Sequence, residues 1–88
     1  MKCITSLDHL KELARETNFE CKLLLNGGVF SRKTISYDPE EFEWSMINHI
    51  DDTVDEFSSD EDFIQSYPSF FEAIKKGALV YDPENCFV

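Results

Sequence analysis

The chain has 88 residues, the length of one domain, and 42% of them are hydrophobic. Aromatic residues make up 14%, which excludes a disordered acidic segment, because such segments lack the side chains that build a core. The net charge of −10 opposes direct binding to nucleic acid or to an anionic membrane, since both are negatively charged. We therefore expect one folded domain spanning residues 1–88.

The first half of the chain predicts a helix followed by a hairpin. Apolar residues recur at helical intervals across 7–14, and Ser6 precedes them as a helix N-cap. Residues 19–25 alternate and then become continuously apolar, which is typical of a buried strand. Asn26-Gly27-Gly28 is a strong turn signal. The segment 29–37 is then expected to be the partner strand of the hairpin.

A third strand is expected across 41–48, after a turn at Asp38-Pro39-Glu40. Alternation places Phe42, Trp44 and Met46 on one face of this strand. The opposite face begins with two glutamates.

The last part of the chain predicts a short strand and two helical segments. A turn at Asp51-Asp52-Thr53 leads to a strand at 54–57, and Ser58 or Ser59 caps an acidic helical turn. Ser69 is expected to cap a helix at 70–76 that ends at Gly77. A final strand is expected at 78–81.

These elements predict an α+β fold: a mainly antiparallel β-meander with an N-terminal helix and a helix from the C-terminal half packed on it. The apolar phase of each element predicts a buried core. Its members are Leu10, Leu13, Leu23, Leu25, Ile35, Trp44, Phe57, Phe63, Ile74 and Leu79.

The cysteines and histidines predict neither a disulfide nor a metal site. Cys3, Cys21 and Cys86 are odd in number, and neither His9 nor His49 completes a zinc-ligand spacing. An EF-hand loop requires a glycine within the acidic region, which has none. We expect a soluble, cytoplasmic protein without cofactor or metal, and not an enzyme, because no Cys–His pair or carboxylate pair is marked out by spacing.

The charge distribution is the main functional signal. Residues 34–74 contain no lysine or arginine but hold twelve of the eighteen acidic residues. Ordinary surfaces mix both signs, so this segregation indicates a face that meets a basic partner or imitates a polyanion; a merely solvated face is the alternative. The candidate partner-binding residues are Glu40, Glu41, Glu43, Asp51, Asp52, Asp55, Glu56, Asp60, Glu61 and Asp62.

Two smaller features each allow two interpretations. The segment 26–33 carries Arg32 and Lys33 and predicts either an anion-binding nest or, more simply, a hairpin turn followed by exposed basic residues. Phe70 and Phe71 follow Pro68 and predict either an aromatic presented to a partner or packing between two short helices.

Several runs of residues resemble small uncharacterised proteins of bacteria, prophages and phages. The resemblance covers most of residues 23–80 and lies in Leu25-Asn26-Gly27-Gly28, in Ile50-Asp51-Asp52-Thr53 and in the segment from Glu72 to Leu79. That group has no assigned activity, so the resemblance implies no catalytic residue. In size, acidity and hairpin-rich α+β character the chain is also similar to anti-CRISPR inhibitors, several of which imitate DNA.

We therefore expect a non-enzymatic, phage-type inhibitor, monomeric or weakly dimeric, in the cytoplasm of a bacterial host. Its carboxylates would replace phosphates against the basic nucleic-acid-binding surface of a host defence complex, with Trp44 or Phe71 as apolar anchors. One alternative is an antitoxin or immunity protein that neutralises a basic nuclease. Another is a small structural or self-assembling phage component.

Overall fold

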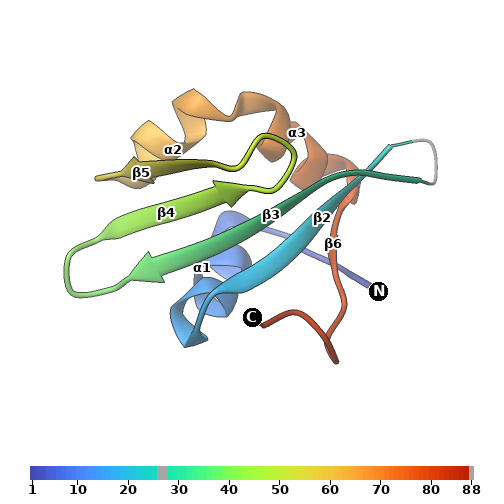
Figure 1. The fold of residues 1–88 in the computed structure, drawn as a ribbon, viewed down its shortest axis with the longest axis horizontal. Helices are drawn as coiled ribbons and strands as arrows, with labels where there is room; N and C mark the ends of the chain where they lie inside the picture. The colour runs from blue at the N-terminus through green and yellow to red at the C-terminus, as the bar shows by residue number, and fades with distance from the viewer. Residues whose placement is uncertain (26–27, 88) are drawn as a thin grey trace.

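The computed structural model describes residues 1–25 and 28–87 and shows one six-stranded sheet with three helices (Figure 1). In chain order the elements are β1 (Lys2–Cys3), α1 (Leu7–Glu16), β2 (Phe19–Leu25), β3 (Gly28–Asp38), β4 (Glu43–Asn48), β5 (Thr53–Phe57), α2 (Asp60–Ser66), α3 (Pro68–Lys76) and β6 (Leu79–Tyr81).

The strands lie in the order β1-β6-β2-β3-β4-β5, and every neighbouring pair is antiparallel. Strands β2 to β5 form a meander, while β6 returns beside β2 and pairs with β1 at the far edge. The predicted α+β class with its antiparallel meander is therefore confirmed. Strand β1 was not predicted, because two residues are too short to show a strand period.

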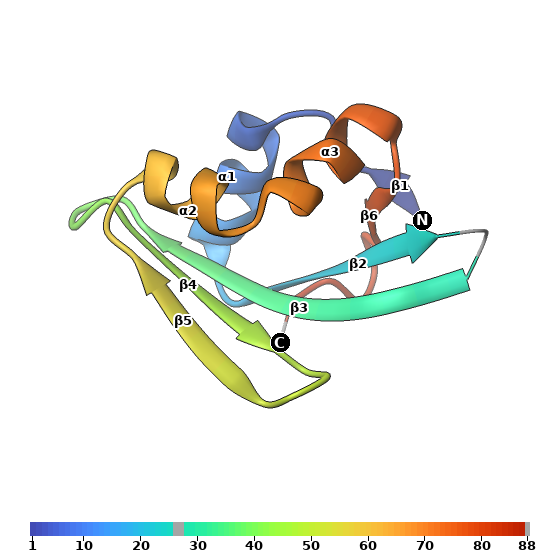
Figure 2. The ribbon, with the colours of Figure 1, turned by 90° about the horizontal axis from the view of Figure 1, so that it is seen from above.

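All three helices cover the same face of the sheet (Figure 2). The alternation of β4 explains this arrangement, since Trp44 and Met46 point to the helical side and are completely buried. Within residues 1–25 and 28–87, no helix lies on the opposite face of the sheet (Figure 2).

Phe63 of α2 lies at the centre of an aromatic cluster between helices and sheet. Trp44 stacks on it at 4.6 Å between ring centroids, and Phe57 meets it edge-on at 5.4 Å. Phe70 and Phe71 of α3 both direct ring edges at Phe63, at 5.9 and 5.4 Å. The two adjacent phenylalanines therefore pack between α2 and α3, and the packing interpretation is the correct one.

The predicted core is largely confirmed. Leu13 and Leu23 are only partly buried, and the side chain of Leu25 lies outside the described part of the chain. The remaining predicted members are buried: Leu10, Ile35, Trp44, Phe57, Phe63, Ile74 and Leu79.

Two predicted helix starts and one helix end are confirmed. The Ser6 hydroxyl accepts a hydrogen bond from the amide of His9, and the Ser59 hydroxyl accepts one from the amide of Asp62, each at 3.1 Å. Gly77 ends α3 with φ +70°, the left-handed conformation that glycine adopts without strain.

The predicted start of the last helix was wrong. Helix α3 begins at Pro68, so Ser69 lies within its first turn and does not cap it. Proline fits the first helical position, because its fixed φ suits the helix and its missing N–H would have had no helical partner.

The hairpin β2–β3 is confirmed by the pairing of Leu25 with Gly28 and of Phe19 with Ile35. Asn26 and Gly27, the centre of the predicted turn, lie outside the described residues.

Strand β4 starts later than expected, and Phe42 is not part of it. The carboxylate of Asp38 accepts a hydrogen bond from the amide of Glu40 at 2.9 Å, which bends the chain directly after β3. The loop then closes with Phe42 at φ +56° and with 66% of its surface exposed. The predicted alternation therefore holds only from Glu43 onward.

Candidate acidic interface

Exposed carboxylates gather at the end of the molecule where β3 turns into β4. Three segments supply them: the end of β3, the following loop with the first residue of β4, and the first turn of α2. We call this surface the acidic end, and its residues are Asp38, Glu40, Glu41, Glu43, Glu61 and Asp62.

The topology brings these three segments together. Asp38 pairs with Glu43 across the hairpin, and Trp44 pairs with Phe57 of β5, so the start of β4 lies beside the end of β5. Helix α2 begins directly after β5, so its first turn lies at the same end (Figure 1), and Glu61 of that turn lines one hollow with Phe42. The predicted residues Glu40, Glu41, Glu43, Glu61 and Asp62 therefore lie at one end of the molecule.

Phe42 is the apolar feature of the acidic end. Its ring lines a shallow hollow of about 340 Å³, together with Lys11, Tyr37 and Glu61. A large aromatic side chain that is exposed among carboxylates matches the composition of an interface anchor. The sequence signal for its position was weak, because Phe42 also fits the alternation of the following strand.

Asp60 lies at the same end, but hydrogen bonds within the protein occupy its carboxylate. Its carboxylate accepts hydrogen bonds from Lys11 Nζ at 2.6 Å and from Trp44 Nε1 at 2.7 Å. Partial burial by itself raises the pKa of Asp60, but the hydrogen bonds from Lys11 and Trp44 outweigh it and lower the pKa below its ordinary value. This carboxylate is less available to a partner than its neighbours.

Asp51 and Asp52 lie away from the acidic end, in the turn between β4 and β5. Thr53 donates to Asp51 from its hydroxyl at 2.7 Å and from its amide at 3.2 Å. The hydroxyl hydrogen bond is the main cause that lowers the pKa of Asp51. Asp52 holds the turn with φ +55°.

Asp55 and Glu56 point to opposite faces of β5, as successive residues of a strand do. Asp55 faces the helices, where its carboxylate accepts a hydrogen bond from the Tyr67 hydroxyl at 2.5 Å. Glu56 is exposed on the helix-free face, opposite Ser45 of β4. The predicted partner-binding residues therefore do not form one array. They lie at both ends of the β4–β5 hairpin, and those of β5 point to opposite faces of the sheet.

Trp44 was a wrong choice of apolar anchor. It is completely buried beneath α2, and Phe71 is partly buried against Phe63. Phe42 is instead the large aromatic residue that is exposed at the acidic end.

The prediction of exposed basic residues after the first hairpin was half wrong. Arg32 is exposed and donates a hydrogen bond to Glu20 at 2.6 Å. Lys33 is buried, with only 8% of its surface exposed. The alternation of the strand predicts the burial of Lys33, because every second residue of a strand points to the same face and Ile35 and Tyr37 are buried.

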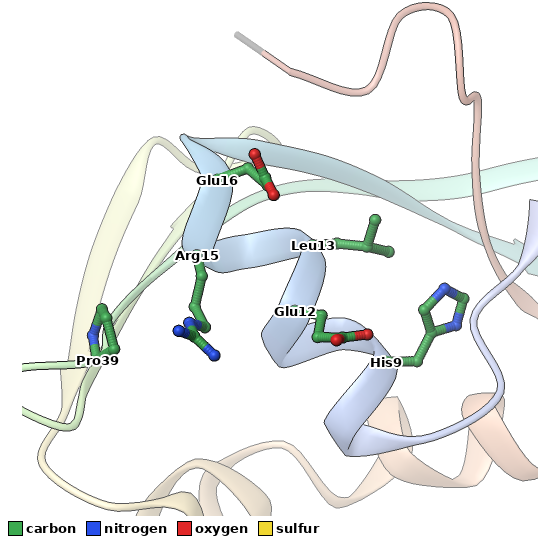
Figure 3. A pocket seen from close by; sticks show the side chains of 6 residues that line it. All are labelled: His9, Glu12, Leu13, Arg15, Glu16 and Pro39. Atoms are coloured by element: carbon green, nitrogen blue, oxygen red, sulfur yellow. The ribbon is translucent and has the colours of Figure 1, made fainter.

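A groove of about 690 Å³ runs along α1 beside the acidic end. Figure 3 shows His9, Glu12, Arg15 and Glu16 on the helix, with Pro39 of the β3–β4 loop beyond them. His9 Nδ1 accepts a hydrogen bond from the amide of Thr5 at 3.3 Å. The lining mixes both charge signs and contains no hydroxyl or thiol nucleophile.

The three cysteines differ in their exposure to solvent. Cys3, Cys21 and Cys86 are free, and the last two are buried. Burial raises the pKa of Cys21 to about 12, which keeps this thiol protonated and unreactive at neutral pH. Across residues 1–25 and 28–87, no group of His, Cys, Asp or Glu side chains is placed to hold a metal ion.

Comparison with protein-family models, curated proteins and solved structures gives no match. In the described part of the chain, no helix has the length and apolarity to cross a membrane. A function has to be inferred from the arrangement of the side chains.

Proposed function

We propose that the chain is a non-enzymatic binding protein whose acidic end docks on the basic nucleic-acid-binding surface of a protein partner. The observation that carries this proposal is the gathering of exposed carboxylates from three segments around the exposed ring of Phe42.

The mechanism is competition with nucleic acid. B-DNA presents about one negative charge per 1.7 Å of its axis, and a groove that receives it carries Lys and Arg. Carboxylates at the acidic end take the place of phosphates in that groove. Their charge accelerates association within a Debye length of about 8 Å, and burial of Phe42 then slows dissociation.

The biological form of the proposal is a phage- or prophage-type inhibitor of a host defence complex, comparable to anti-CRISPR proteins. An antitoxin that neutralises a basic nuclease uses the same surface and is separated from this form by the identity of the partner. A self-assembling component is less favoured, because Lys33 is buried and Arg32 is paired with Glu20, so neither is free to receive the acidic end of another copy.

The experiment is capture of the partner, followed by a competition assay. The tagged protein is incubated with bacterial lysate at low salt, and the retained protein is identified and purified. That protein is then loaded with fluorescent duplex DNA or with its own guide RNA. The proposal predicts that the untagged chain displaces the nucleic acid and that raising the salt concentration weakens the displacement.

Two charge-reversal variants decide whether the acidic end is responsible. The test variant changes the exposed residues Glu40, Glu41, Glu43 and Glu61 to lysine. It is expected to retain its circular dichroism spectrum and to lose displacement, mainly through a slower association rate.

The matched control changes four exposed carboxylates away from the acidic end to lysine, so the net charge of the two variants is identical. These residues are Asp52, Glu56, Glu72 and Glu84. The control is expected to displace nucleic acid nearly as well as the wild type. Equal loss in both variants would show that only overall charge matters, and unchanged displacement by the test variant would rule out the acidic end.

A further inference from the structure

A small cavity of about 230 Å³ lies between the helix-covered face of the sheet and the start of α3. Its polar lining consists of Ser31 and Lys33 of β3, Asn48 of β4, Tyr67 and Ser69. This cavity is separate from the acidic end. Glu43, the first residue of β4, belongs to the acidic end, whereas Asn48, the last residue of β4, lines the cavity.

Lys33 is the central feature of the cavity. Only 8% of the surface of Lys33 is exposed. In the described chain its ammonium group nevertheless makes no ion pair within 4.0 Å and no hydrogen bond. Its Nζ lies 5.4 Å from the centroid of the Tyr67 ring. Among residues 1–25 and 28–87, no side-chain nitrogen or oxygen that is fully enclosed lacks a partner, so Nζ keeps some contact with solvent, and Lys33 lines the cavity.

The first turn of α3 adds further positive potential. Ser69 and Phe70 of this turn line the cavity, no side chain caps the helix, and the turn contains no acidic residue. Pro68 has no N–H and the amide of Phe70 donates to the Tyr67 carbonyl at 3.1 Å, which leaves the Ser69 amide of this turn to favour negative charge in the same space as the buried lysine.

The size and the remaining lining restrict the ligand. Leu23, Ile50 and Phe70 supply apolar walls. The volume lies below the range of roughly 300–1,000 Å³ of typical ligand pockets, so only a small molecule or one terminal group fits.

The charge of the surroundings selects between anions. One lysine neutralises one negative charge. Asp51 lies near enough for Lys33 to contribute to lowering its pKa, and Asp55 contacts the Tyr67 hydroxyl. The two aspartates already exceed the single charge of Lys33, so each negative charge on a ligand is repelled, and a monocarboxylate brings one such charge where a dianionic phosphate brings two.

We propose that this cavity binds a small organic monocarboxylate, with its oxygens between Lys33 Nζ and the first turn of α3 and its short apolar part against Ile50 and Phe70.

The test is an NMR titration of the full chain with sodium butyrate, at constant ionic strength set by sodium chloride. Saturating shifts are expected for the backbone amides of Ser31, Asn48 and Ser69, with a dissociation constant in the millimolar range. Butyramide, which has the same shape without the charge, is expected to produce no saturating shift.

Two variants test the binding groups. Lys33→Met keeps the buried stem and removes the charge, and it should weaken butyrate binding by at least about tenfold. Ser69→Asp places a carboxylate in the first turn of α3, where it stabilises the helix while repelling the ligand. Lys75→Met is the matched control, because Lys75 is exposed at the other end of the same helix.

The outcomes separate the proposal from its competitors. Saturation by butyrate in the wild type and in the Lys75→Met variant, lost in Lys33→Met and in Ser69→Asp, supports it. Tighter binding of inorganic phosphate would overturn the choice of a monocarboxylate. Shifts that stay linear with butyrate, or that saturate equally with butyramide, would overturn the site itself.

Discussion

Lys11 of α1 donates a hydrogen bond to Asp60, the first residue of α2, with 2.6 Å between Nζ and Oδ2. The same carboxylate accepts the indole N–H of the completely buried Trp44. One acidic side chain therefore joins both helices to the centre of the sheet. Among the predicted partner-binding residues, Asp60 stabilises the fold, while its neighbours at the acidic end remain exposed.

Replacing Asp60 measures this structural role. Asp60→Ala leaves the Trp44 N–H without an acceptor and Lys11 without its anion, so a loss of about 1–3 kcal/mol in the free energy of unfolding is expected. Asp60→Asn retains an oxygen for Trp44 and should cost less. Glu61→Ala, at the next position but exposed, should change stability by no more than about 0.5 kcal/mol. Urea denaturation followed by Trp fluorescence measures all three, and equal losses for Asp60→Ala and Glu61→Ala would contradict the assignment.

The same carboxylate predicts an acid dependence of stability. The folded protein lowers the pKa of Asp60 below its unfolded value of about 4, so the ionised form is preferred in the folded state. The stabilisation is complete above that unfolded value and is lost as the pH falls through the folded pKa. Between neutral and strongly acidic pH, the free energy of unfolding should thus fall less with decreasing pH for Asp60→Asn than for the wild type. Parallel curves for the two proteins would contradict this linkage.

The cysteines predict a selective pattern of alkylation. Cys3 is exposed, whereas Cys21 and Cys86 are buried and burial raises the pKa of both thiols. Iodoacetamide should modify Cys3 alone in the native protein and all three thiols in denaturant, as intact mass would show. A reductant should leave the melting temperature unchanged, because the three cysteines are free. Rapid native modification of Cys21 would contradict the buried position of β2.

The strand periods allowed much of the fold to be predicted from the sequence. The bounds of β2 and the inward direction of Trp44 and Met46 follow from alternation and are correct. Lys33 could have been placed inside by the same parity, but its charge suggested the surface. The Lys11–Asp60 pair could not be foreseen, because its partners are 49 residues apart and meet only through tertiary packing.

The sequence predicted one array of partner-binding carboxylates, of which the acidic end holds only a part. The course of β4 explains why the predicted residues are separated. An extended strand separates the residues before it from those after it by its own length, so Glu41 and Asp51 lie at opposite ends of β4. Phe42 was assigned to the strand face because it fits the alternation. The Asp38 hydrogen bond to the Glu40 amide, which delays the strand, is a local event that composition does not reveal.

Phe42 offers a test in which stability and binding are expected to change in opposite directions. A bulky residue at φ +56° is strained, and its exposed ring gains little from packing. Phe42→Gly should therefore raise the free energy of unfolding by about 1 kcal/mol, because glycine adopts this conformation without strain. The same change removes the proposed anchor, so affinity for the captured partner should fall through faster dissociation.

Asp52→Gly is the matched control for this experiment. Asp52 has nearly the same backbone conformation, φ +55°, but lies in the turn at the opposite end of the β4–β5 hairpin. Relief of strain should stabilise this variant as well, by a smaller amount because aspartate tolerates the left-handed region better than phenylalanine. Its affinity for the partner should remain close to that of the wild type. If both glycine variants bind normally, strain at Phe42 has no connection with recognition, and the acidic end acts through charge alone. If Phe42→Gly instead destabilises the protein, the ring contributes more to the hollow beside Lys11 and Tyr37 than its exposure indicates.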